Sequence, residues 1–322
     1  MLKKRGYQAQ KPSDVPLRGW WDISKRLVHN LGQDNLSLAA AGVAFYGLLA
    51  IFPALAALLS LYGYLFSAAD MVEQLDRALS LLAPASQDLV MSQVQELNAQ
   101  SQASLSISAI VGFVLTIWSS SKGAQAMITA CNISYHESKK RNLFIALLTR
   151  FVFAFGAIII AVVALATIGI LPVILNYVGF ERNIDWTIKL ITWALLAAIF
   201  LLSLSIIYRY APHRRAAKWR WLSCGALIAT CMWVVASIGF SFYVSRFASY
   251  SETYGSLAGV VIMLMWLYIS AYIVILGAAI NASIEQQTLT DSTIGEPRSR
   301  GERGATVADE LTTKQRQQVD KE

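Results

Sequence analysis

Six long stretches without a charged residue interrupt this chain of 322 residues. Each contains 19 to 35 residues, and a helix of about 20 apolar residues crosses roughly 30 Å of hydrocarbon. Only 15% of the residues are charged, against about 25% in soluble domains. The pattern therefore predicts an all-α polytopic membrane protein with six transmembrane helices. Their apolar cores are residues 36–66, 105–128, 151–175, 190–208, 221–243 and 257–280.

Lysine and arginine predict the orientation of these helices, because short cytoplasmic connections carry an excess of both residues. The segment before the first helix contains seven of them, and the connections after the second and fourth helices contain four and five. The intervening connections carry one, two and one, namely Arg77, then Arg182 with Lys189, then Arg246. The alternation predicts that both termini are cytoplasmic.

The regions outside the helices divide the chain into three parts. Trp20, Ile23 and Leu27 recur at helical spacing before the first span, which indicates an amphipathic helix at the membrane interface. The segment between the first two spans indicates two short external helices separated near Pro84. The predicted parts are a cytoplasmic N-terminus (1–34), a membrane domain (35–284, with the external segment 69–104) and a largely disordered polar tail (285–322).

The most unusual polar stretch lies where the second helix approaches the cytoplasm. It contains Ser119, Ser120, Ser121 and Lys122, and apolar residues resume after it. An ionisable group inside the membrane costs several kcal/mol unless it reaches water. Lys122 therefore either lines a substrate cavity or extends its side chain to the cytoplasmic surface. Arg150, near the start of the third helix, carries the same two interpretations.

A cluster of bases ends the fourth helix. Arg209, Arg214 and Arg215 lie within seven residues, with His213 among them. Guanidinium groups match the geometry of phosphate, so the three arginines are candidates for binding an anionic head group. The alternative is that they only fix the orientation of the helix.

Several other residues indicate helix geometry rather than chemistry. Pro53 predicts a kink in the first helix, which either lines a binding site or has no further role. Gly255 and Gly259 have the spacing that permits close helix contact, and Asn281 is expected to form hydrogen bonds between helices. We predict no catalytic residue, metal site or cofactor, because the three histidines are scattered and no paired acidic motif occurs.

Several ordered motifs resemble the YihY/BrkB family of bacterial inner-membrane proteins, over about residues 15–287. The family usually has an acidic residue where this chain has Ala279, and Glu285 is a candidate for a partial substitute. The motifs are Asp34–Ala41 continuing to Phe52-Pro53, Tyr208–Arg215, Ser245–Tyr250, Thr253–Gly259, Leu264–Tyr268 and Gly277–Ala282.

The resemblance implies a location more firmly than a reaction. It implies a multi-pass protein of the bacterial inner (plasma) membrane, in a family once labelled ribonuclease BN by mistake and linked to serum resistance and export of envelope lipids. The resulting hypothesis is a transporter or flippase of an anionic lipid or other envelope component, with membrane lipids as partners. A membrane scaffold is the alternative. Ribonuclease activity and nucleic-acid binding are not expected, and a homo-oligomer is left open.

Overall fold

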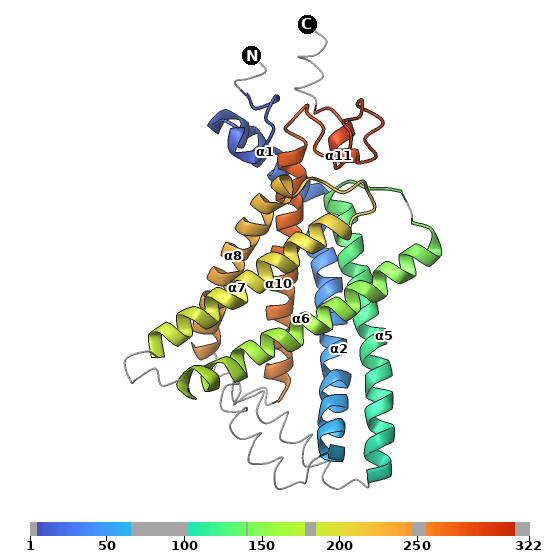
Figure 1. Cartoon of the computed structure of the whole chain (residues 1–322), viewed down its shortest axis with the longest axis vertical. Helices are drawn as coiled ribbons and strands as arrows, with labels where there is room; N and C mark the ends of the chain where they lie inside the picture. Colours follow the sequence, from blue (N-terminus) through green and yellow to red (C-terminus); the bar gives the residue numbers. More distant parts are fainter. Residues whose placement is uncertain (1–4, 66–101, 140, 178–184, 247–255, 313–322) are drawn as a thin grey trace, which may run out of the picture.

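The computed structural model describes residues 5–65, 102–139, 141–177, 185–246 and 256–312, and in these ranges the regular elements are helices (Figure 1). One isolated bridge pairs Ala217 with Thr293. The elements are η2 (Pro12–Asp14), α1 (Leu17–Gln33), α2 (Leu36–Leu65), α5 (Gln102–Ser134), α6 (Leu143–Tyr177), α7 (Asp185–Tyr210), α8 (Trp219–Arg246), α10 (Ser256–Glu285) and α11 (Thr306–Asp309).

Five helices of the described residues are long and apolar enough to cross a membrane. The second predicted span, 105–128, lies in α5, which is helical but is not among the five. An all-helical protein with several membrane-spanning helices is thus confirmed, while six crossings and cytoplasmic termini stay predictions. The predicted external helices fall almost entirely on residues 66–101, outside the described ranges. The five candidate spans are Leu36–Ala54, Leu143–Ala164, Leu190–Tyr210, Trp219–Ser245 and Ala258–Glu285.

Three helices, α2, α5 and α10, stand upright in the bundle (Figure 1). α2 and α5 run side by side, α10 packs against α2 and α8, and α6 and α7 cross the bundle diagonally (Figure 1). Apolar side chains of α6 such as Leu148, Val152 and Phe155 are 56%, 60% and 47% exposed. Such residues on a membrane-length helix are suited to contact with lipid, since lipid tails are as apolar as the side chains.

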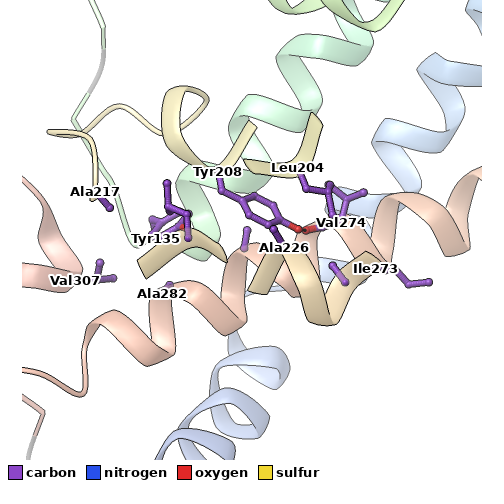
Figure 2. Close-up of a cluster of buried hydrophobic side chains, with 12 residues drawn as sticks. Tyr135, Leu204, Tyr208, Ala217, Ala226, Ile273, Val274, Ala282 and Val307 are labelled. Atoms are coloured by element: carbon purple, nitrogen blue, oxygen red, sulfur yellow. Dashed lines mark hydrogen bonds between the residues drawn. The ribbon is translucent and has the colours of Figure 1, made fainter. Parts of the chain in front are cut away.

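We call the end of the bundle that carries α1 and α11 the polar end (Figure 1). Its core holds α7, α8 and α10 together, and the Tyr208 hydroxyl donates to the carbonyl of Val274 at 2.7 Å (Figure 2). A Cβ at Gly277 would collide with the Tyr208 hydroxyl, so this glycine permits the close approach of α10 to its neighbours. Asn281 joins α10 to α8, because its amide accepts from Gly225 N at 2.7 Å and donates to Leu222 O at 2.9 Å.

The other residues predicted to shape the helices are only partly described. α2 continues through Pro53 to Leu65. Gly259 is buried in α10, whereas Gly255 lies outside the described residues. The close helix contact seen at Gly225 and Gly277 therefore occurs at the opposite end of α10 from the predicted glycine pair.

The N-terminal amphipathic helix corresponds to α1. Ile23 is buried against Trp221 and Ile284 at the ends of α8 and α10. Trp21, on the other face, is 64% exposed. The Arg26 side chain donates to Ser283 O at 2.8 Å and Gln287 Oε1 at 2.7 Å, and burial lowers the pKa of Arg26 to about 10. α1 is therefore fixed to the polar end by one face and leaves apolar groups on the other.

The first part of the C-terminal tail is folded, which differs from the largely disordered tail expected from its composition. Residues 286–312 cover the polar end, and Asp291 and Thr293 are buried there. The Asp291 carboxylate accepts from the N–H groups of Thr293 and Arg298, and Arg303 donates to Leu289 O and Ala308 O. Charged and hydroxyl side chains thus satisfy the backbone of a segment that has no apolar periodicity. Residues 313–322 are outside the described ranges.

Candidate functional site: a cationic vestibule

A cavity of about 450 Å³ opens at the polar end between the last turns of α5, the start of α6 and the connection from α7 to α8. We call it the vestibule. Its wall combines polar residues of α5 with four basic side chains and one carboxylate. The lining residues are Gln125, Ile128, Thr129, Asn132, Ile133, Glu137, Ser138, Lys139, Arg141, Ala146, Arg150 and His213.

Three of the basic side chains in the vestibule have buried donor or acceptor nitrogens without a hydrogen-bond partner among the described residues. They are Nη1 of Arg141, Nε of Arg150 and Nδ1 of His213. Buried polar groups in proteins are usually paired, because an unpaired one costs about 1–3 kcal/mol. An oxygen-rich anion bound against these side chains would supply acceptors to Nη1 of Arg141 and Nε of Arg150.

The chain holds these groups in place through bonds to the backbone. Nη2 of Arg141 donates to the carbonyls of Tyr210 and Pro212 at 2.9 and 3.0 Å, which leaves Nη1 unpaired. The N–H of His213 donates to Asn132 Oδ1 at 2.7 Å, so the α7–α8 connection is fixed to α5. Burial, and then the charges of Arg141 and Lys139, lower the pKa of His213 below its ordinary value.

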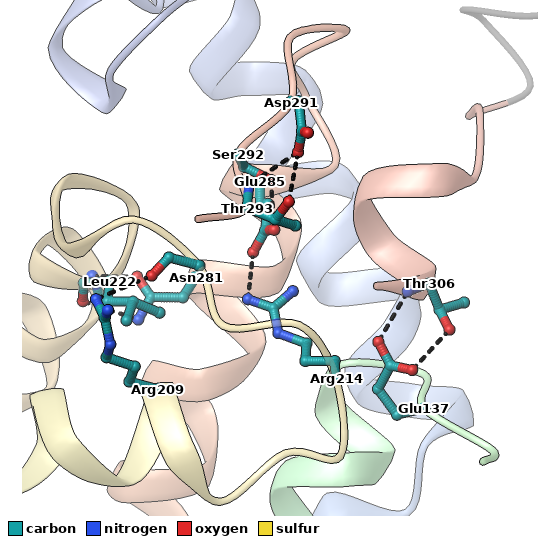
Figure 3. Close-up of polar contacts among 12 residues, drawn as sticks. Glu137, Arg209, Arg214, Leu222, Asn281, Glu285, Asp291, Ser292, Thr293 and Thr306 are labelled. Carbon is teal, nitrogen blue, oxygen red and sulfur yellow. Dashed lines mark hydrogen bonds and ion pairs between the residues drawn. The ribbon is translucent and has the colours of Figure 1, made fainter. Parts of the chain in front are cut away.

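The carboxylate of the vestibule, Glu137, is occupied by the tail. Its two oxygens accept from the N–H and the hydroxyl of Thr306 at 2.8 and 3.0 Å (Figure 3). Burial raises the pKa of Glu137, although these two bonds oppose the shift. The two donors of Thr306 thus satisfy the hydrogen-bonding capacity of the Glu137 carboxylate. The four basic side chains outnumber this single acid in the wall of the cavity.

The predicted head-group cluster is not assembled as one site. The side chain of Arg214 is fully buried and donates from Nη2 to Glu285 Oε2 at 2.7 Å (Figure 3). Its guanidinium lies over the ring of Tyr135 at 4.2 Å, and Glu285 also accepts from the Ser292 hydroxyl at 2.6 Å. Glu285, the predicted substitute for the missing family acid at Ala279, is therefore the partner of a structural arginine.

The two other arginines of that cluster point to different partners. Arg209 donates to Ala217 O at 3.1 Å and lies over the ring of Trp219 at 4.4 Å. Arg215 donates to Glu296 O at 3.1 Å, in the folded tail. Some donors of these arginines are also unpaired, but none of the three residues lines the vestibule.

Lys122 lines a second cavity of about 470 Å³, between α2 and α5, which we call the groove. It is half-buried there, and its ammonium lies 5.9 Å from the ring of Trp118. Ser119 and Ser121 are buried and Ser120 is partly buried, and none of the three lines either cavity. The groove is lined by Asp34, Asn35, Leu38, Ala39, Gly42, Tyr46, Lys122, Gln125, Ala126, Thr129 and Ile133.

Of the predicted site residues, the structure thus places Arg150 in the vestibule and Lys122 in the groove. Sequence reasoning missed Lys139, Arg141 and His213 as members of one site. Lys139 and Arg141 contributed only to the prediction of helix orientation, and His213 was grouped with the Arg209–Arg215 cluster. The sequence did contain a signal for this grouping. Lys139 and Arg141 come just before α6, and Arg150 lies near the start of that helix, so the three residues fall at one end of α6. No group of three or more metal-ligating side chains occurs in the described ranges.

Comparison with known proteins identifies relatives along most of the chain. A protein of Bacillus subtilis named as ribonuclease-like, YfkH, is 31% identical over 77% of this chain and 90% of its own length. A UPF0761 membrane protein of Aliivibrio salmonicida is 26% identical over 81% of both chains. One of Photobacterium profundum is 26% identical over 85% of this chain and 83% of its own.

No solved structure matches the chain. The family described as virulence factor BrkB matches residues 27–302, a range that contains the vestibule, the groove and most of the folded tail. The ribonuclease-like name within this group is a mislabel. The chain belongs to the BrkB family of membrane proteins.

Proposed function

We propose that this protein binds the phosphate-bearing head group of an anionic lipid or another envelope component in the vestibule, as the first step in moving it across the bacterial inner membrane. The observation that carries the proposal is the set of unpaired buried nitrogens on Arg141, Arg150 and His213 around one cavity. Guanidinium groups recognise phosphate oxygens with short, charge-assisted hydrogen bonds.

The size and position of the vestibule support a lipid head group. Its volume of about 450 Å³ falls within the range of about 300–1,000 Å³ that is usual for ligand pockets. α6, which contributes Arg150, is a candidate membrane span with apolar side chains on its exposed surface. With the termini in the cytoplasm, the vestibule faces the leaflet interface where anionic lipids attract basic groups.

The site favours binding over catalysis. Metal-dependent hydrolysis of RNA uses clustered carboxylates or histidines, whereas the vestibule gathers basic groups around one carboxylate held by Thr306. A scaffold is the second candidate function, and the folded tail favours it, because residues 286–312 present a defined surface at the polar end. The two functions differ in whether the lipid moves.

A binding measurement tests the proposal directly. Fluorescent phosphatidylglycerol is titrated against the purified full-length protein in detergent, with the same dye on phosphatidylcholine for comparison. We expect preference for the anionic lipid, and about tenfold weaker binding, or about 1.4 kcal/mol, for Arg150→Gln. Arg220→Gln is the matched control, since Arg220 is exposed on α8. Equal binding of both lipids, together with an unaffected Arg150→Gln variant, would overturn the proposal.

A further inference from the structure

The vestibule and the groove meet along one face of α5. Gln125, Thr129 and Ile133 line both cavities. Residues four apart on a helix lie one above the other, so these three form a ridge with one cavity on each side. Gln125 and Thr129 are exposed on it, which makes the ridge polar over most of its length.

Along α5 the groove reaches about one helical turn deeper than the vestibule, because it extends from Gln125 to Lys122. Gly123 lies against Tyr46, since a Cβ at this glycine would be 3.7 Å from Cβ of Tyr46. Lys122 is therefore level with Tyr46, which is ten residues after the start of α2 at Leu36. At a rise of 1.5 Å per residue this is about 15 Å along α2, or half of the hydrocarbon thickness.

The Lys122 side chain points along α5 away from the polar end. Side chains on an α-helix tilt toward its N-terminus, and the N-terminus of α5 lies at the end opposite the polar end (Figure 1). The ammonium lies over Trp118, one turn farther from the polar end, as this tilt requires. A lysine extended to the nearer surface would point the other way.

The wall that α2 contributes to the groove is open and apolar. Leu38 is 73% exposed and Gly42 is partly exposed, although both belong to a candidate membrane span. An acyl chain fits such a wall, whereas a free, fully hydrated anion does not. At the mouth of the groove lies Asp34, whose carboxylate is 3.5 Å from His136 Nε2. This carboxylate disfavours direct entry of an anion from water.

We propose that the groove is a second, deeper site for the same ligand, a phospholipid with an anionic head group. The head group binds first at Arg141 and Arg150, then crosses the polar ridge of α5 to Lys122, while an acyl chain follows the surface of α2. The inference rests on the proposed function and extends it, since it names an acylated phosphate as the substrate class and α5 as the route.

The experiment separates the two sites. Vesicles containing the reconstituted protein and fluorescent phosphatidylglycerol are assayed for lipid translocation, and the vestibule is assayed separately by the binding titration above. We expect Lys122→Gln to lose translocation at least tenfold while binding stays within twofold, and Lys122→Arg to retain both activities. Arg150→Gln should lower both activities. Lys25→Gln, an exposed change on α1, serves as the control.

Each outcome has a distinct meaning. Normal translocation by Lys122→Gln with intact binding overturns the route through the groove and leaves the vestibule in place. Failure of Arg150→Gln to affect binding overturns the vestibule itself. Glycerol phosphate that competes as well as the lipid would identify a free phosphate compound, and would overturn the acylated substrate.

A second measurement does not depend on any variant folding. Phosphatidylglycerol with a photoactivatable group on its acyl chain is cross-linked to the unmodified protein, and the labelled peptides are identified. We expect labelling of α2 between Leu38 and Tyr46 that unlabelled phosphatidylglycerol suppresses. Labelling confined to α6 and α7 would overturn the proposed site.

Discussion

Two groups of arginines at the polar end differ in what surrounds them. Arg214 is enclosed by protein, with the carboxylate of Glu285 at 2.7 Å and the ring of Tyr135 beneath its guanidinium. All three arginines have unpaired nitrogens, but only Arg141 and Arg150 line a cavity. The first group therefore has its anionic partner within the fold, and we propose that the second binds a ligand. Similar side chains acquire different roles according to whether the fold supplies the anion.

The largest expected effect comes from breaking the enclosed pair. Arg214→Ala leaves the buried carboxylate of Glu285 without its charged partner, a change that costs about 3–5 kcal/mol in comparable cases. We expect a correspondingly lower free energy of unfolding, or no folded protein, measured by thermal unfolding in detergent. Arg220→Ala, on the exposed side of α8, should change stability by less than about 0.5 kcal/mol.

The double variant Arg214→Met with Glu285→Leu sharpens this test. Replacing both members of a buried ion pair by apolar residues of similar size is often neutral or stabilising, so stability should return toward the parent. If Arg214→Ala is as stable as Arg220→Ala, the ion pair between Arg214 and Glu285 does not contribute to holding the α7–α8 connection in place.

A smaller loss is expected at Asn281, another polar residue whose partners all belong to the protein. Asn281→Ala leaves Gly225 N–H and Leu222 C=O without their amide partner in a buried interface between α8 and α10. The cost should be about 1–3 kcal/mol in the same unfolding assay. Asn132→Ala offers a comparison at a partly buried position, because Asn132 contributes one hydrogen bond to His213. Equal losses at both positions would argue against burial as the cause.

A substitution in the vestibule should have the opposite effect on the free energy of unfolding. Arg150→Leu removes a partly buried charge that has an unpaired nitrogen, so the free energy of unfolding should stay constant or rise by up to about 1 kcal/mol. The same variant should bind phosphatidylglycerol more weakly. A marked loss of stability would assign Arg150 to the structural group instead, and would remove the contrast between the two sets of arginines.

The sequence predicted the membrane class because long apolar stretches have few physical alternatives. Charge-free windows anticipated α2, α6, α7, α8 and α10, and the helical spacing of Trp20, Ile23 and Leu27 anticipated α1. These features depend on residues that are neighbours along the chain. The exposed and buried faces of each helix were less predictable, since nearly every position is apolar.

The site was predicted only in part, because its members come from three separate segments. Arg150 and Lys122 stood out as charges inside apolar stretches, and both line cavities. Arg214 stood out equally, yet its partner Glu285 lies in a distant helix, and nothing near Arg214 in the sequence reveals that pairing. The folded tail escaped prediction for a similar reason, since its order depends on side-chain hydrogen bonds rather than apolar burial.

The smallest expected effect is a dependence on pH through His213. Its pKa lies below the ordinary value because of burial and the charges of Arg141 and Lys139. As pH falls through the window just below about 6.5, the unfolded chain takes up more protons at this site than the folded protein, so stability should decrease slightly.

A bound anion reverses the preference at His213, because it favours the protonated ring. Phosphatidylglycerol should therefore bind more tightly at pH 5.5 than at pH 7.5, by at most about threefold if the anion raises the pKa by half a unit. Titrations at both pH values should show this difference in the parent and in His29→Gln, an exposed histidine outside the vestibule, and no difference in His213→Gln. An unchanged pH dependence in His213→Gln would place the head group away from this ring, and would restrict the ligand-binding group to the two arginines.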